Sequence, residues 1–189
     1  RKQLAEFAPR TDNVVLRPAV NAQRNIEKFA ATAAKFVKFT IKATTGGQPC
    51  VDELEVWSAD RNVALATHGT TATSSSNLPG YEIHKLAHIN DGKTGHSHSW
   101  ISNETGAGWV MLEFADTVDI ERMEWGRDRG GRYTDRLATD YVIEVSTDGR
   151  AWKTVASSAD RLPFRPGQPE EPVYDFAAAA PDRARQGMA

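Results

Sequence analysis

The clearest pattern along the chain is an alternation of apolar and polar side chains within residues 35–44 (KFVKFTIKAT). A period of two places every second side chain on the same face of an extended strand. The segment is therefore predicted to be a half-buried β-strand, with one face carrying Val37, Phe39 and Ile41 and the other carrying Lys38, Thr40 and Lys42.

Several further short runs have strand character, and turn residues separate them. An Asp148–Gly149 pair predicts a tight turn that leads into one more strand, because glycine readily takes the positive φ that such turns need. Helical periodicity is almost absent, so the fold class is predicted to be an all-β sandwich. The predicted strands are residues 50–57 (CVDELEVW), 108–114 (GWVMLEF), 118–126 (VDIERMEWG), 139–146 (TDYVIEVS) and 152–156.

The length of 189 residues fits one domain with appendages. Charge mixed with alanine, asparagine and proline marks residues 1–33 as an N-terminal arm, and a region rich in proline and alanine marks residues 161–189 as a C-terminal arm. The sandwich is expected over residues 34–160.

Composition excludes several classes of protein. A net charge of −2 gives no concentrated basic surface for nucleic acid, and no apolar run is long enough to span a membrane. The single cysteine, Cys50, excludes an internal disulfide and a cysteine-based zinc site, and a buried inert thiol is expected. No motif of a known catalytic class occurs, so the chain is not expected to be an enzyme.

Four segments together resemble the coagulation-factor type C, or discoidin, family, which is similar to family 32 carbohydrate-binding modules. DELEVW resembles the terminal strand of that family, and NVALATHGTTATSSS its opening strand and loop. INDGKTGHSHSWIS resembles its metal-binding loop, and YVIEVSTDGRAWKTVA its late hairpin. The terminal strand here precedes the opening one, so the order resembles a circular permutation.

The resemblance implies a galactose-binding-like jelly roll whose loops at one end bind glycans, phospholipid head groups or protein surfaces. It also implies a structural calcium ion, held by carboxylates of Asp91 and Glu53. The shell would be completed by the carbonyls of His88 and Lys93 and by an oxygen of Ser97 or Thr94. Calcium prefers six to eight oxygen ligands, and Gly92 would let the backbone bend around the ion.

Two alternatives compete with calcium at this loop. Asp91–Gly92 can simply form a turn without any ion, since this residue pair is common in turns. Zinc is the other alternative, because imidazole nitrogens are frequent zinc ligands. Its candidate ligands are His84, His88, His96 and His98.

A second unusual stretch, WGRDRGGRYTDRLATDY, combines arginines, aspartates and two glycines. Guanidinium groups can grip hydroxyls, carboxylates or phosphates, and an aromatic ring can stack on a sugar face. A loop of internal ion pairs without a ligand is the alternative. The candidate ligand-binding residues are Arg127, Arg129, Arg132 and Tyr133, joined by His96 and His98 from the neighbouring loop.

The expected function is therefore a non-catalytic carbohydrate-binding module with a structural calcium ion, appended to a larger bacterial protein outside the cytoplasm. The alternative is a structural module whose loops dock on neighbouring domains or partner proteins without binding glycan.

Overall fold

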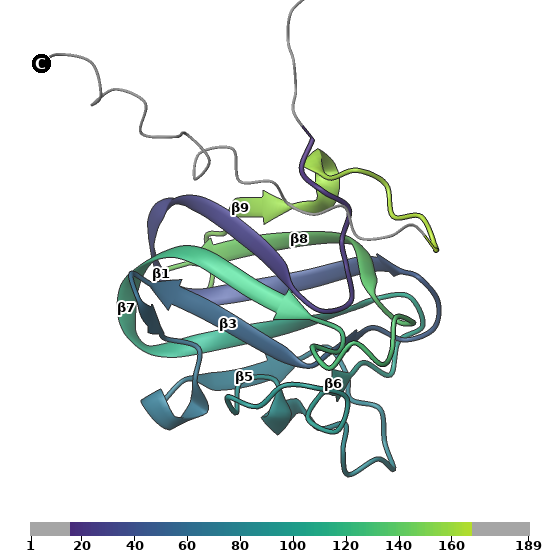
Figure 1. The fold of residues 1–189 in the computed structure, drawn as a ribbon. Coiled ribbons are helices and arrows are strands. Elements are labelled where there is room, and N and C mark those ends of the chain that lie inside the picture. Colours follow the sequence, from purple (N-terminus) through teal and green to yellow (C-terminus); the bar gives the residue numbers. More distant parts are fainter. Residues whose placement is uncertain (1–15, 168–189) are drawn as a thin grey trace, which may run out of the picture.

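The computed structural model describes residues 16–167, which form an antiparallel β-structure (Figure 1). In the described part of the chain, helical structure is limited to three short 3-10 turns: η1 (Ala66–His68), η2 (Leu86–His88) and η3 (Ser158–Asp160). The strands are β1 (Asn25–Thr44), β2 (Cys50–Val51), β3 (Glu53–Ser58), β4 (Arg61–Asn62), β5 (Thr71–Ser74), β6 (Trp100–Ile101), β7 (Gly108–Gly126), β8 (Ala138–Ser146) and β9 (Lys153–Ser157). The prediction of an all-β fold is confirmed.

Two long strands, β1 and β7, organise the sandwich. The main sheet has the order β4-β3-β7-β1-β8-β9, with β5 also paired to β7, while β2 and β6 form a separate pair. The register between β1 and β7 shifts after Lys28 and again after Ala34. Such irregularities bend strands, and Figure 1 shows both long strands curving over at the same edge. The two halves of each strand therefore contribute to different layers, as in a jelly roll.

The core lies between these layers and is built from the predicted alternation. Val37, Phe39 and Ile41 are each at most 2% exposed. The Phe39 ring packs against Trp125 and Tyr141, with ring centroids 5.2 and 5.4 Å apart. Burying one such side chain stabilises the fold by about 1.5–3 kcal/mol, so these contacts hold β1 against the second half of β7.

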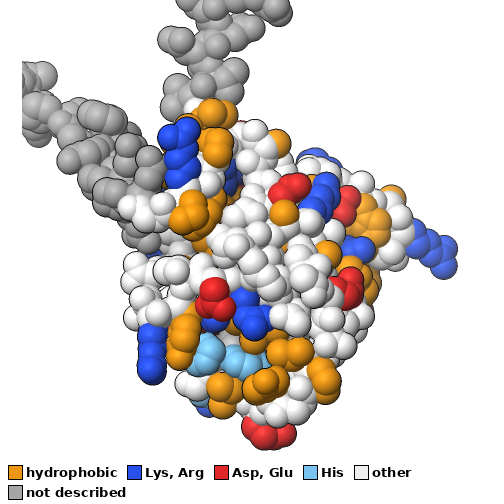
Figure 2. Space-filling view, turned by 90° about the vertical axis from the view of Figure 1, so that its right-hand side faces the viewer, with side chains coloured by type: hydrophobic (Ala, Val, Ile, Leu, Met, Phe, Trp, Pro, Cys, Tyr) orange, Lys and Arg blue, Asp and Glu red, His pale blue; other side chains and the backbone are white. Residues whose placement is uncertain are grey.

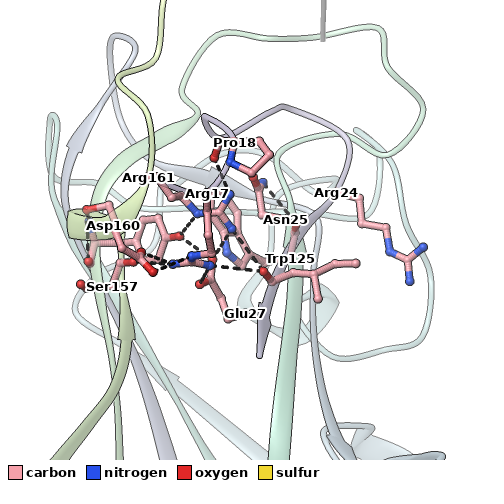
Figure 3. A network of polar contacts seen from close by, with 12 residues as sticks. Arg17, Pro18, Arg24, Asn25, Glu27, Trp125, Ser157, Asp160 and Arg161 are labelled. Carbon is pink, nitrogen blue, oxygen red and sulfur yellow. Dashed lines mark hydrogen bonds and ion pairs between the residues drawn. The ribbon is translucent and has the colours of Figure 1, made fainter. Parts of the chain in front are cut away.

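The predicted boundary between arm and sandwich at residues 33/34 falls inside β1, which begins at Asn25. The reason is a polar network around Glu27, which is fully buried (Figure 3). Its carboxylate pairs with Arg17 at 2.6 Å and with Arg161 at 2.7 Å, and it accepts a hydrogen bond from the Tyr141 hydroxyl. Residues from before and after the predicted sandwich in the sequence thus meet to fix the start of β1. Residues 1–15 and 168–189 of the two predicted arms lie outside the described residues.

The loops that carry the candidate chemistry lie away from this network. In Figure 1 the N-terminal segment sits beside β9 and η3 in the upper part, whereas β6 and the segments flanking it occupy the lower part. Trp100 on β6 is fully buried beneath these loops, and its indole N–H donates to the Asn77 side chain at 3.0 Å. This anchored tryptophan gives the loops a rigid base.

Candidate functional site

Two long loops meet at this end of the sandwich, residues 75–99 before β6 and residues 127–137 between β7 and β8. The pairing of Cys50 with Ile101 and of Val51 with Trp100 brings β6 against the segment that leads into β3. Cys50 itself is buried and burial raises the pKa of its thiol to about 11, which agrees with the expected inert role.

A pocket of about 230 Å³ opens between the two loops. Figure 2 shows a face of the molecule on which histidines are surrounded by hydrophobic side chains, with basic and acidic groups next to them. Three of the predicted ligand-binding residues line the pocket: His96, Arg127 and Tyr133. The other lining residues are Leu78, Tyr81, His84, Ile101, Asp135 and Arg136.

Arg127 forms the fixed charge of the pocket and is only 2% exposed. Its guanidinium donates to the Asp135 carbonyl at 2.8 Å and to the Asp135 carboxylate at 3.0 Å. It also lies over the Tyr133 ring, 5.3 Å from the centroid. The His96 and Tyr133 rings pack against each other at an angle of 34°, with centroids 4.1 Å apart. A cation and two rings are thereby held in one arrangement before any ligand arrives.

The two histidines of the pocket are neutral at pH 7. Burial lowers the pKa of His84 to about 4, and the nearby His96 ring and Arg127 charge add to that effect. Burial and Arg127 also lower the pKa of His96. The His84 ring lies 2.7 Å from the Ser99 hydroxyl through Nδ1. Neutral imidazoles both donate and accept hydrogen bonds, which suits hydroxyl-bearing ligands.

The remaining predicted ligand residues do not line the pocket. The Arg129 side chain reaches back to Glu55 on β3 at 2.9 Å, and its backbone N–H donates to Asp52 at 2.6 Å. Arg132 is exposed, and its guanidinium lies over the Tyr133 ring, 5.4 Å from the centroid. Asp128 determines the path of this loop. Its buried carboxylate accepts the backbone N–H groups of Gly130, Arg132 and Tyr133.

The Glu53 carboxyl group lies beside the Asp91–Gly92 turn. Glu53 Oε1 accepts the Gly92 N–H at 3.1 Å, and Gly92 has a φ of +81°, which favours glycine. Glu53 Oε2 is buried and has no hydrogen-bond partner among the described residues. Burial, followed by the charges of Asp91 and Glu55, raises the pKa of Glu53 to about 9. A buried carboxylate with a free oxygen is a suitable ligand for a hard cation.

The other residues predicted for calcium lie in the same loop. Lys93, Thr94 and Ser97 are exposed, and the Lys93 N–H donates to Asp91 Oδ1 at 2.8 Å. Their side chains contribute no further carboxylate, so any additional oxygens would come from backbone carbonyls, hydroxyls or solvent.

The four histidines of the predicted zinc site do not converge. His84 and His96 lie together in the pocket with ring centroids 4.9 Å apart, whereas His88 and His98 form a separate pair at 5.0 Å. The second pair meets Asp91, and one ligand atom from each of the three residues lies within 4.8 Å of the other two. The loop path between η2 and β6 separates the histidines in this way, which their spacing in the sequence could not reveal.

Sequence reasoning missed most of the apolar wall of the pocket. Tyr81 follows Gly80 in a turn and is 56% exposed. Its ring centroid lies 5.8 Å from that of His84. An exposed aromatic residue in a loop rich in histidine was the one available signal. Leu78 carries no such signal because it stands in a polar stretch, and Ile101 carries none because it reads as part of a short apolar pair with Trp100.

Comparison with protein families matches residues 71–176 to the F5/8 type C domain, which is more than half of the chain. Comparisons with curated proteins and with solved structures find no match. The strands β1 and β3 precede the matched region yet belong to the same sheet as β7 and β8. No helix in residues 16–167 is long and apolar enough to cross a membrane.

Proposed function

This chain belongs to the F5/8 type C domain family of non-catalytic modules that bind carbohydrates or proteins, and we propose that it binds a carbohydrate in the pocket between its two loops. The observation that carries the proposal is the preformed combination of Tyr133, His96 and Arg127. A sugar ring has apolar C–H faces that stack on an aromatic ring and hydroxyls at its edge. The pocket offers both kinds of contact at one place.

The size and charge of the pocket narrow the ligand. Its volume of about 230 Å³ is below the ~300–1,000 Å³ of sites for drug-sized molecules, which favours a single sugar residue. Arg127 and Arg136 face one carboxylate, that of Asp135, and the histidines are uncharged at pH 7. One positive charge is left over, so a sugar that carries a carboxylate or sulfate group is favoured over a neutral one.

The test is calorimetric titration with galactose, galacturonic acid and a sulfated monosaccharide. Tyr133→Ala is expected to weaken binding about fivefold, since a stacking aromatic contact contributes on the order of 1 kcal/mol. Arg129→Gln serves as the control because Arg129 pairs with Glu55 outside the pocket and its loss should leave the affinity unchanged. Absence of binding to every sugar, together with binding to a neighbouring domain of the parent protein, would favour the protein-docking alternative.

Calcium is the proposed structural cofactor, with carboxylate ligands from Glu53 and Asp91. The supporting observation is the buried Glu53 oxygen that lacks a partner beside the Asp91 loop. When bound, the ion would neutralise the two carboxylates and fix the loop against β3. A chelator is then expected to lower the melting temperature, and Asp91→Ala should abolish that difference. An unchanged melting curve would contradict the calcium site and leave the sugar proposal standing.

The proposed setting is a larger bacterial protein that acts outside the cytoplasm. The location is supported by the family, whose members are commonly extracellular. Fractionation of cells that express the whole parent protein would test the location.

A further inference from the structure

Three metal-binding side chains meet at the loop between η2 and β6, outside the sugar pocket. A ring nitrogen of His88, a ring nitrogen of His98 and a carboxylate oxygen of Asp91 all lie within 4.8 Å of one another. Each of the three residues is half-buried. Their ligand atoms are therefore held by the surrounding structure and remain accessible from solvent.

The donor atoms are also oriented for a metal. The Nδ1 atom of His88 lies 3.2 Å from the Ile83 carbonyl oxygen. That contact requires the proton on Nδ1, which leaves the lone pair of Nε2 free. Asp91 Oδ1 is fixed by the Lys93 N–H at 2.8 Å, while Oδ2 lies 3.3 Å from Nδ1 of His98. Imidazole–carbonyl contacts of this kind commonly accompany metal-bound histidines.

We propose that His88, Asp91 and His98 bind a divalent transition-metal ion of the zinc class. Two imidazole nitrogens and one carboxylate oxygen suit Zn²⁺ and Co²⁺, whereas calcium takes oxygen ligands almost exclusively. Solvent access leaves room for a water as a further ligand. The site shares Asp91 with the proposed calcium site but depends neither on calcium nor on the sugar pocket.

A metal at this point would cross-link the loop. His88 is the last residue of η2, and His98 directly precedes Ser99 and the buried Trp100. The ion would thus join the two ends of the segment that contains Asp91 and Gly92. Because only the folded chain brings the three ligands together, Zn²⁺ is expected to raise the melting temperature.

The experiment titrates the tag-free, chelator-treated protein with Zn²⁺ by calorimetry and with Co²⁺ by visible absorption. The expected result is one ion per chain and a Co²⁺ spectrum that shows nitrogen ligation. His88→Gln and His98→Gln should each raise the Kd for Zn²⁺ by about tenfold or more. His68→Gln is the matched control, because His68 also ends a 3-10 turn and its Nδ1 lies 3.1 Å from a carbonyl oxygen, that of Asn62.

A Glu53→Gln variant separates this site from the calcium site. It should retain the affinity for Zn²⁺ and lose the thermal shift caused by Ca²⁺, since Glu53 is not one of the three ligands. Absence of saturable Zn²⁺ binding by the wild-type protein would overturn the proposal. Equal Zn²⁺ affinity of the wild type, His88→Gln and His98→Gln would overturn it as well.

Discussion

The Glu53→Gln variant tests the electrostatics of the buried carboxyl group on β3. Glu53 is 1% exposed, accepts one hydrogen bond from Gly92, and has a pKa raised to about 9 by burial and by the charges of Asp91 and Glu55. Its ordinary pKa of 4.5 applies to the unfolded chain. Between pH 4.5 and about pH 9, Glu53 keeps its proton in the metal-free folded protein and loses it in the unfolded chain. The contribution of Glu53 to stability is therefore complete below pH 4.5 and is lost as the pH rises toward 9.

The size of the effect follows from this window. Each pH unit in which only the folded state holds the proton removes about 1.4 kcal/mol from the free energy of unfolding. About 3 kcal/mol is therefore lost between pH 4.5 and pH 7. Glutamine has a similar shape and no titration in this range, so the variant should gain about 3 kcal/mol relative to the wild type over the same interval.

The assay is urea denaturation followed by tryptophan fluorescence at several pH values between 4.5 and 8.5, with a chelator present. Glu113→Gln is the matched control, because Glu113 is an exposed glutamate on β7. The difference between Glu53→Gln and the wild type should grow with pH, while that of the control should stay flat. Added Ca²⁺ should stabilise the wild type and leave Glu53→Gln unchanged. Parallel pH profiles for the wild type and Glu53→Gln would refute the reasoning.

Three further variants test other parts of the structure. Gly126→Ala should destabilise the fold by about 1–3 kcal/mol in thermal denaturation, because its Cβ would lie 2.4 Å from the Gln23 carbonyl oxygen, and wild-type stability would contradict the close approach. Glu27→Gln should cost about 3–5 kcal/mol in urea denaturation, since two arginines lose a buried partner, and a neutral result would mean that the network contributes little. His84→Gln should make the protein lose less stability on acidification. The pKa of His84 is about 4 in the folded state, below the ordinary 6.5, so the unfolded chain takes up the proton first as the pH falls from 6.5. Melting curves between pH 7 and pH 4.5 would check it, and equal acid sensitivity of variant and wild type would contradict it.

The parts of the fold that could be predicted from the sequence depend on local patterns. The alternation around Phe39 specifies which face of β1 is buried, because a strand repeats every two residues wherever it is placed. The Asp148–Gly149 turn is equally local, since Gly149 has a φ of +71° and the Asp148 carboxylate accepts the backbone N–H groups of Arg150 and Ala151. Resemblance to the family paired Glu53 with Asp91, and the structure places Glu53 beside the Asp91–Gly92 turn, a long-range contact that no local pattern contains.

The parts that could not be predicted depend on partners far away in the chain. The segment that opens β1 is rich in alanine and carries Glu27 at a buried position, so its alternation is weak in the sequence. Arg17 and Arg161, 10 and 134 residues away, compensate the burial of that carboxylate together with the Tyr141 hydroxyl. In the same way, the sequence of the basic loop does not distinguish Arg127 from Arg129. Arg127 turns into the pocket and Arg129 turns toward β3, because Asp52 and Asp128 accept the backbone N–H groups of Arg129 and Gly130.

The loop before β6 divides its histidines between two kinds of chemistry. His96 faces Tyr133 and Arg127, where burial and positive charge keep the imidazole neutral for hydrogen bonding. His98, two residues later, faces the Asp91 carboxylate, where negative charge favours a bound cation. Because one residue separates them, an ion that fixes His98 also restricts the backbone that positions His96. Metal binding and sugar binding at this end of the sandwich would then be coupled through the loop, and thermodynamic linkage requires that each ligand change the affinity for the other by the same factor.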